Sequence, residues 1–171
     1  ISSGTFNVGD VIRVLPTGQE STIATIEKFE TKLSHAIAGD SVTITLTTDI
    51  DISRGNTVVL ASEVQPPQLK DFSAQVCWLD HTALSPGKTY LLQHGIHTTK
   101  AKISQITARL DVATQSATEG VSTLQLNEIG TIALRTAQPI SADRYAANPA
   151  NGAFILIDEF SNSTVGVGFV N

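Results

Sequence analysis

Short runs of alternating apolar and polar residues, rich in Val, Ile and Thr, recur along the chain between clusters of Gly, Pro, Asp and Asn. The clearest run is 41–47, where three aliphatic side chains fall on one face and four hydroxyl side chains on the other. Such period-two alternation predicts a half-buried strand. Residues 11–15 and 21–26 flank a Pro-Thr-Gly-Gln stretch at 16–19, which predicts a hairpin because Pro presets the turn and Gly permits positive φ.

A composition break at 61–68, with consecutive prolines, predicts a boundary between two domains, 1–65 and 66–171. Strands are expected in the second domain at 72–79, 89–93, 100–110, 129–134, 154–157 and 164–170. One slip in the alternation of 100–110 predicts a bulge, and 154–157 has the pattern of a strand buried on both faces. Helix is expected only as short turns at 124–127 and 142–147. The predicted fold class is all-β, two small β-barrels in tandem.

Charge and composition narrow the classes of function. Eleven Lys and Arg against sixteen Asp and Glu give a net charge of −5, with no basic run in the sequence, which disfavours nucleic-acid and anionic membrane partners. A single cysteine, Cys77, rules out an intrachain disulfide and fits a reducing compartment, so we expect a cytoplasmic location. The absence of Met, even at Ile1, suggests a piece of a longer protein.

Candidate phosphate and nucleophile chemistry is weak in this sequence. No G-x-x-x-x-G-K-[ST] phosphate loop is present. Gly166 and Gly168 form only G-x-G, which we interpret as a strand that needs small residues where another backbone approaches. Cys77 sits in an apolar run without a neighbouring cation, which indicates an inert packed thiol. No serine stands in a G-x-S-x-G elbow.

Histidines and carboxylates supply the remaining candidates. His94 and His97 have a metal-like spacing, but no Cys or H-E-x-x-H partner, so they are interpreted as exposed or cross-strand polar residues, as is His35. The adjacent pair Asp80 and His81 would diverge on a strand.

Two acidic pairs resemble the paired carboxylates of glycosidases: Asp49 with Asp51, and Asp158 with Glu159. For Asp49 and Asp51 the favoured interpretation is a polar strand edge, with Ile50 and Ile52 buried opposite. Arg54 would neutralise the carboxylates and Gly55 would make the next turn. We therefore predict no catalytic, cofactor-binding or metal-binding residue in this chain.

Motifs in both halves resemble a known family. Residues 4–12 (GTFNVGDVI) and 49–55 (DIDISRG) are similar to the second domain of translation-type GTPases, and the acidic form of the latter resembles the GTPase subunits (subunit 1) of sulfate adenylyltransferase, or ATP sulfurylase. Five further segments resemble the third domain of that family: residues 84–90, 126–130, 143–149, 152–158 and 161–166. Many relatives carry Thr where this chain has Asn151, which still suits a turn, and we expect Arg144 to anchor the turn at 148–152.

The resemblance implies a division of labour. GTP and magnesium would be bound by a GTPase domain that precedes these residues, so no cofactor is expected here. The intact protein would couple GTP hydrolysis to the transfer of an adenylyl group from ATP to sulfate. The implied partners are sulfate adenylyltransferase subunit 2 and the protein's own GTPase domain, with no nucleic acid and no membrane. The barrels would act as docking and relay elements, inactive when isolated.

The same resemblance implies that the first barrel lacks its opening strand, so we expect it to be open-edged or to borrow a strand. Two other functions stay open. The chain could be the barrels of an elongation factor that bind aminoacyl-tRNA, or an autonomous enzyme that uses one of the two acidic pairs.

Overall fold

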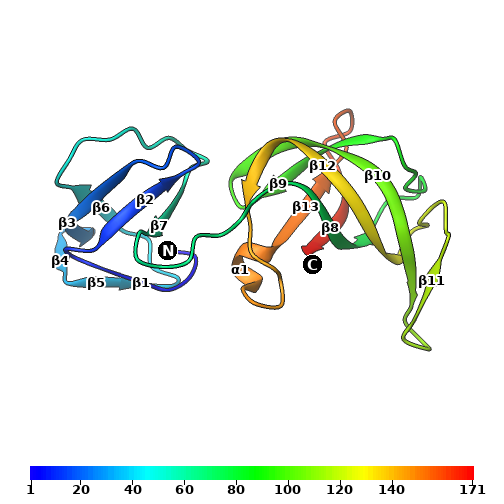
Figure 1. The fold of residues 1–171 in the computed structure, drawn as a ribbon, viewed down its shortest axis with the longest axis horizontal. Helices are drawn as coiled ribbons and strands as arrows, with labels where there is room; N and C mark the ends of the chain where they lie inside the picture. The colour runs from blue at the N-terminus through cyan, green and yellow to red at the C-terminus, as the bar shows by residue number, and fades with distance from the viewer. The chain divides into compact units, whose positions relative to one another are not determined.

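The computed structural model describes residues 1–171 and is almost entirely β-sheet, which confirms the all-β prediction (Figure 1). The chain divides into two compact units, Ile1–Pro66 and Pro67–Asn171. No helix is long and apolar enough to cross a membrane. The strands of the first unit are β1 (Thr5–Asn7), β2 (Val11–Leu15), β3 (Glu20–Lys28), β4 (Thr31–Leu33), β5 (His35–Ile37), β6 (Thr43–Leu46) and β7 (Thr57–Leu60).

The first unit is a curled sheet built around the hairpin that the sequence predicts. Strands β2 and β3 pair antiparallel across the 16–19 turn, in which Gly18 has φ 76°. The order is β4-β3-β2-β7, with β6 also paired to β3, while β1 and β5 form a separate pair. In β6, Ile44 and Leu46 pack on a core that includes Ile12 and Ile26, which confirms the alternation of 41–47.

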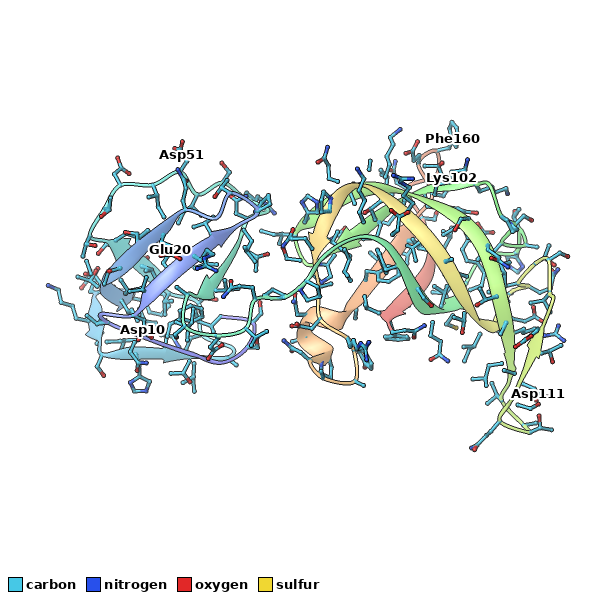
Figure 2. All side chains as sticks on the ribbon, in the orientation of Figure 1. Asp10, Glu20, Asp51, Lys102, Asp111 and Phe160 are labelled. Atoms are coloured by element: carbon cyan, nitrogen blue, oxygen red, sulfur yellow. The ribbon has the colours of Figure 1, made fainter.

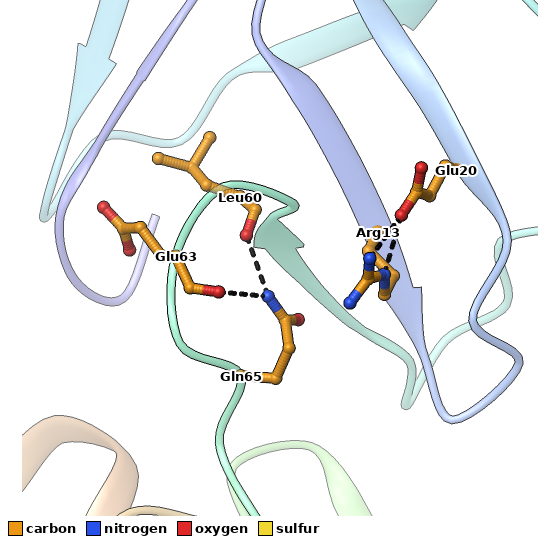
Figure 3. Close-up of polar contacts among 5 residues, drawn as sticks. All are labelled: Arg13, Glu20, Leu60, Glu63 and Gln65. Carbon is orange, nitrogen blue, oxygen red and sulfur yellow. Dashed lines mark hydrogen bonds and ion pairs between the residues drawn. The ribbon is translucent and has the colours of Figure 1, made fainter.

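This sheet does not close into a barrel. Strand β7 pairs with β2 on one side only, and β4 ends the sheet on the other side. The prediction of an incomplete, open-edged first barrel is therefore confirmed. Beyond β7, the Gln65 amide donates hydrogen bonds to the carbonyls of Leu60 (3.0 Å) and Glu63 (2.7 Å), and so shapes the chain where it leaves the unit (Figure 3). On the neighbouring hairpin, Arg13 Nε donates to Glu20 Oε1 at 2.9 Å.

The second unit is a closed barrel. Its strands are β8 (Gln68–Trp78), β9 (Thr89–His94), β10 (His97–Asp111), β11 (Ser116–Glu119), β12 (Ile129–Ser141), β13 (Ala153–Ile157) and β14 (Thr164–Val170). The sheet runs β11-β10-β12-β8-β14-β13-β9, and the pairing of β9 with β10 closes it into a ring, with β11 outside as an extension of β10. Closure removes the exposed sheet edges that invite aggregation.

Several strands of this barrel are longer than predicted. β8 starts at Gln68, inside the expected linker, and β12 continues to Ser141. β10 carries two register shifts against β12 where one was expected, at Ile103/Gln105 and at Ile106/Ala108. The underestimate has a physical reason: Gln68 and Leu69 pair with Ser141 and Ile140, and this pairing between distant segments keeps both extended without apolar alternation of their own.

The two predicted helical turns require correction. Residues 124–127 are not helical, because Leu124 forms a β-bridge with Leu84 and both side chains are buried. Residues 142–147 contain only a turn at 145–147. The one helix, α1 (Pro149–Gly152), begins just after it, with Pro in its first turn, where a missing N–H costs nothing.

The glycines of β14 make room for aromatic rings, which corrects the expectation that another backbone approaches them. A Cβ at Gly168 would lie 2.1 Å from the ring of Phe154, and one at Gly166 would lie 3.3 Å from Trp78. β13 is also not buried on both faces. Phe154 and Leu156 point into the core, whereas Ile155 is half-buried.

Tyr90 makes the stability of this barrel sensitive to alkaline pH. Its ring packs edge-on against Trp78 with centroids 5.5 Å apart. Burial, aided by the charges of Asp158 and Asp80, raises the pKa of its hydroxyl to about 12. Tyrosine in the unfolded chain ionises near pH 10. The stability that comes from keeping this phenol neutral is therefore complete below pH 10 and is lost as pH rises through about 12.

We expect the free energy of unfolding of the second unit to fall between pH 10 and 12, and the Tyr90→Phe variant to lose less across that window. Denaturant titration followed by the fluorescence of Trp78, the one tryptophan, measures both proteins. An equally steep alkaline loss in Tyr90→Phe would show that this hydroxyl is not responsible.

Candidate functional surface

The acidic pair of the first unit does not lie on a strand. Asp49 and Asp51 are exposed in an irregular segment after β6 (Asp51 is labelled in Figure 2). Just before this segment, the Ser21 hydroxyl donates to the Thr48 carbonyl and accepts from the Thr48 N–H, so a side chain satisfies both backbone groups of Thr48. Of the two isoleucines predicted to be buried, Ile50 packs against the core of the unit, whereas Ile52 is 45% exposed. The two carboxylates therefore face solvent.

The rest of that motif is corrected in part. Arg54, expected to neutralise the carboxylates, is exposed in a turn and makes no ion pair. Gly55 does form the expected turn and has φ 102°.

The acidic pair of the second unit shapes the loop between β13 and β14. Asp158 accepts hydrogen bonds from the backbone N–H groups of Phe160 (3.0 Å) and Ser161 (2.8 Å). These bonds, that of Ser161 first, hold the pKa of Asp158 below its usual value. Glu159 pairs with Lys100 at 3.0 Å. A carboxylate with a lowered pKa is a poor proton donor near neutral pH, so Asp158 is suited to building a turn rather than to acid catalysis.

His94 and His97 stand opposite each other across the two-residue turn between β9 and β10, which confirms the cross-strand reading. His94 is buried rather than exposed, and its Nε2 lies 3.0 Å from the carbonyl oxygen of Asn151. His97 Nε2 is buried without a hydrogen-bond partner. No three His, Cys, Asp or Glu side chains are grouped as a metal site.

The turn that receives His94 is anchored by a carboxylate rather than by Arg144. Asp143 Oδ2 accepts hydrogen bonds from the side-chain amides of Asn148 (2.9 Å) and Asn151 (3.1 Å). The Arg144 side chain is exposed, and only its backbone carbonyl takes part. The amide of Asn151 also donates to the Ser141 carbonyl, a contact that a threonine would have no N–H to make.

The other candidates lie apart from one another. Cys77 is half-buried on β8. Asp80 accepts from the Thr82 N–H within its own turn, and the neighbouring His81 is exposed. His35 is exposed on β5, with Nδ1 3.2 Å from the hydroxyl of Ser34. The contact between Ser34 and His35 is the one base–hydroxyl pair among them, and no carboxylate contacts His35 to complete a triad.

This chain has no glycine-rich loop that joins a strand to a helix N-terminus, the usual cradle for a nucleotide phosphate. Its helix α1 has four residues and follows a turn rather than a glycine-rich loop at the end of a strand. We therefore derive no step through GTP or magnesium on these residues.

A basic groove is the feature that the sequence did not reveal. It lies on the outer surface of the second unit, across β8, β9, β10 and β12, and four of the eleven Lys and Arg of the chain contribute to it. Its lining residues are Lys70, Thr89, Lys100, Lys102, Arg135, Thr136 and Ala137.

Two cations face each other in this groove. Lys102 on β10 is the direct register partner of Arg135 on β12, and Thr89 of β9 is its partner on the other side. Like charges at directly opposite positions destabilise a sheet. Arg135 has a long contact of 3.6 Å with Asp71, whereas Lys70 and Lys102 make no ion pair. The groove thus concentrates positive charge at a cost to the fold.

An exposed aromatic ring lies on the loop between β13 and β14. Phe160 is 95% exposed and is labelled in Figure 2. Asp158 fixes its backbone, and Glu159 beside it pairs with Lys100 of the groove. The loop therefore presents an apolar ring next to the basic groove from a rigid turn.

This groove could have been anticipated only in part. Lys100 and Lys102 are two apart, so a strand places both on one face. Lys70 and Arg135 come close to Lys100 and Lys102 only because strands far apart in the sequence pair with one another. No local sequence pattern predicts that pairing.

Comparison with known proteins identifies the class of this fold. A family model described as GTP-eEF1A C-terminal domain-like matches residues 71–171, and the chain belongs to this family. Crystal structures of Sup35 complexed with GDP and with GMPPNP have the same fold, with TM-scores of 0.86 and 0.87. The alignments cover 99% of this chain and 42% of each of those chains at 21% identity.

Curated relatives that match the whole chain share one activity name. Sulfate adenylyltransferase subunit 1 is 39% identical in Psychromonas ingrahamii, over 100% of this chain and 36% of the relative. The Cellvibrio japonicus protein of the same name is also 39% identical, over 99% of this chain and 36% of the relative. The bifunctional enzyme CysN/CysC of Mycobacterium tuberculosis is 37% identical over 99% of this chain and 28% of the relative. The chain spans about a third of the length of these relatives, and the resemblance to the sulfate adenylyltransferase GTPase subunits is confirmed.

Proposed function

We propose that this chain serves as the C-terminal β-barrel part of the GTPase subunit of sulfate adenylyltransferase. In the intact enzyme ATP and sulfate would give adenosine phosphosulfate, driven by GTP hydrolysis. The observation that carries the proposal is identity of 37–41% along the whole chain with proteins named sulfate adenylyltransferase subunit 1 or CysN/CysC.

Within that enzyme the barrels act as a docking and relay module without an active site of their own. Their partners are subunit 2 and the GTPase domain, which would hold GTP and magnesium. Neither nucleic acid nor membrane is a partner, and the location is the cytoplasm, which suits the free thiol of Cys77. Support comes from the chemistry of the surface: charged and aromatic groups gather in a groove and on a loop, as binding groups do, rather than around one point.

Titration of this chain against the partner subunit tests the docking role. We expect saturable binding at micromolar concentration or tighter, and no turnover of ATP and sulfate by the chain alone. The control is the same titration with a chain that has been unfolded in denaturant, cross-linked in that state and then diluted. This control has the same amino-acid composition but no folded barrels. Absence of binding at high micromolar concentration would leave the chain with no docking role.

A further inference from the structure

We propose that the basic groove and Phe160 together form the surface that receives a protein partner, and that the partner presents carboxylates around an apolar recess. The inference rests on the docking role proposed above and adds where docking occurs and by what chemistry. The groove is the set Lys70, Thr89, Lys100, Lys102, Arg135, Thr136 and Ala137.

The charges of the groove are arranged for a partner rather than for the barrel. Lys102 and Arg135 repel across a strand pair, and neither Lys70 nor Lys102 has a carboxylate of its own chain. A structural role would place opposite charges at such positions, because these stabilise a sheet. On a chain with a net charge of −5, the groove is therefore complementary to an acidic surface.

Phe160 supplies the apolar anchor. An exposed side chain normally loses rotational freedom and backbone freedom when it binds, and both losses weaken affinity. Here Asp158 already fixes the backbone of Phe160 through hydrogen bonds to residues 160 and 161. Burial of the ring in a partner would remove its apolar surface from water and so favour binding. A preorganised ring beside a charged groove has the composition of an interface anchor with a polar rim.

The same groups do not suit a nucleic acid. A phosphate backbone needs a track of cations, and single-stranded binders add several aromatic platforms. Here one aromatic ring stands beside the groove, and two of the four cations are contacted by Glu159 and Asp71. Only Lys70 and Lys102 are then left without a carboxylate partner, which is too few for a track along a phosphate backbone.

Charge reversal tests the groove in the full chain. The variant K70E/K102E should bind the partner subunit at least about tenfold more weakly than the parent, with most of the salt dependence of binding lost. The matched control is K32E/R144E, which changes the charge equally at two exposed cations without ion pairs outside the groove, and it should change affinity less than about twofold. Equal losses in both variants would show a nonspecific charge effect and overturn the proposal.

A stability measurement separates binding from folding. Because Lys102 faces Arg135, Lys102→Thr should leave the melting temperature unchanged or higher while it weakens binding several-fold. If Lys102→Thr lowers both in proportion, the residue is structural and the proposal fails.

Phe160→Ala should weaken binding about tenfold, whereas Phe29→Ala, which removes the other phenylalanine that is 95% exposed, should not. Binding that survives all groove and Phe160 variants would overturn this surface but keep the docking role. No binding by the parent chain would overturn both. Tight binding of RNA that K70E/K102E abolishes would show that the groove serves a nucleic acid instead.

Discussion

Replacing Trp78 with Ala should lower the free energy of unfolding of the second unit by about 3–5 kcal/mol, the usual cost of truncating a buried aromatic residue. Trp78 is 1% exposed, packs edge-on against Tyr90, and donates its indole N–H to the Thr82 carbonyl at 2.8 Å. The variant loses apolar contacts, leaves a cavity and strips a partner from that carbonyl. Denaturant unfolding followed by far-UV circular dichroism measures the change.

The neighbouring residue provides the control for this substitution. Leu79 is 40% exposed, and Leu79→Ala should change stability by less than about 0.5 kcal/mol. If Trp78→Ala cost no more than Leu79→Ala, the barrel core assigned to residues 67–171 would be wrong.

The second large effect is expected at Gly168. A Cβ there would lie 2.1 Å from the Phe154 ring, so Gly168→Ala should destabilise the second unit by about 1–3 kcal/mol through overpacking. Gly168 is not among the positive-φ residues, so the loss comes from the clash rather than from backbone strain. Thermal unfolding is the measurement. Gly166→Ala, on the same strand with its nearest contact at 3.3 Å, is the control and should cost less.

The clash between a Cβ at position 168 and the Phe154 ring also predicts how substitutions at the two positions combine. Since Phe154→Leu removes the offending ring atoms, it should restore part of the stability lost in Gly168→Ala, so the two losses should not add. Strict additivity in the double variant would place the cause of the Gly168 effect elsewhere.

The local parts of the fold could be predicted from the sequence. The hairpin of β2 and β3 and the strand β6 are predicted because apolar alternation and a Pro-Gly turn act within a few residues. β1 and β11 have three and four residues with little burial, so only their partner strands specify them. Leu124 shows the same limit: its place in a β-bridge depends on Leu84, forty residues away.

The candidate surface was less accessible to sequence reasoning. The expectation of no basic cluster holds along the chain but fails in space, because barrel closure brings Lys70 and Arg135 beside Lys102. In the sequence Phe160 is one more apolar residue; only the structure shows that its side chain is exposed on a loop whose backbone Asp158 fixes. Surface chemistry of this kind depends on register between distant strands.

The central claim is that these barrels engage the partner subunit of sulfate adenylyltransferase without catalysing the reaction. Addition of the 171-residue chain to the assembled two-subunit enzyme tests it most directly. The account predicts that adenosine phosphosulfate synthesis falls as the chain displaces the whole subunit, and that K70E/K102E inhibits at least about tenfold less well. Undiminished synthesis at a large excess of the folded chain would contradict the account.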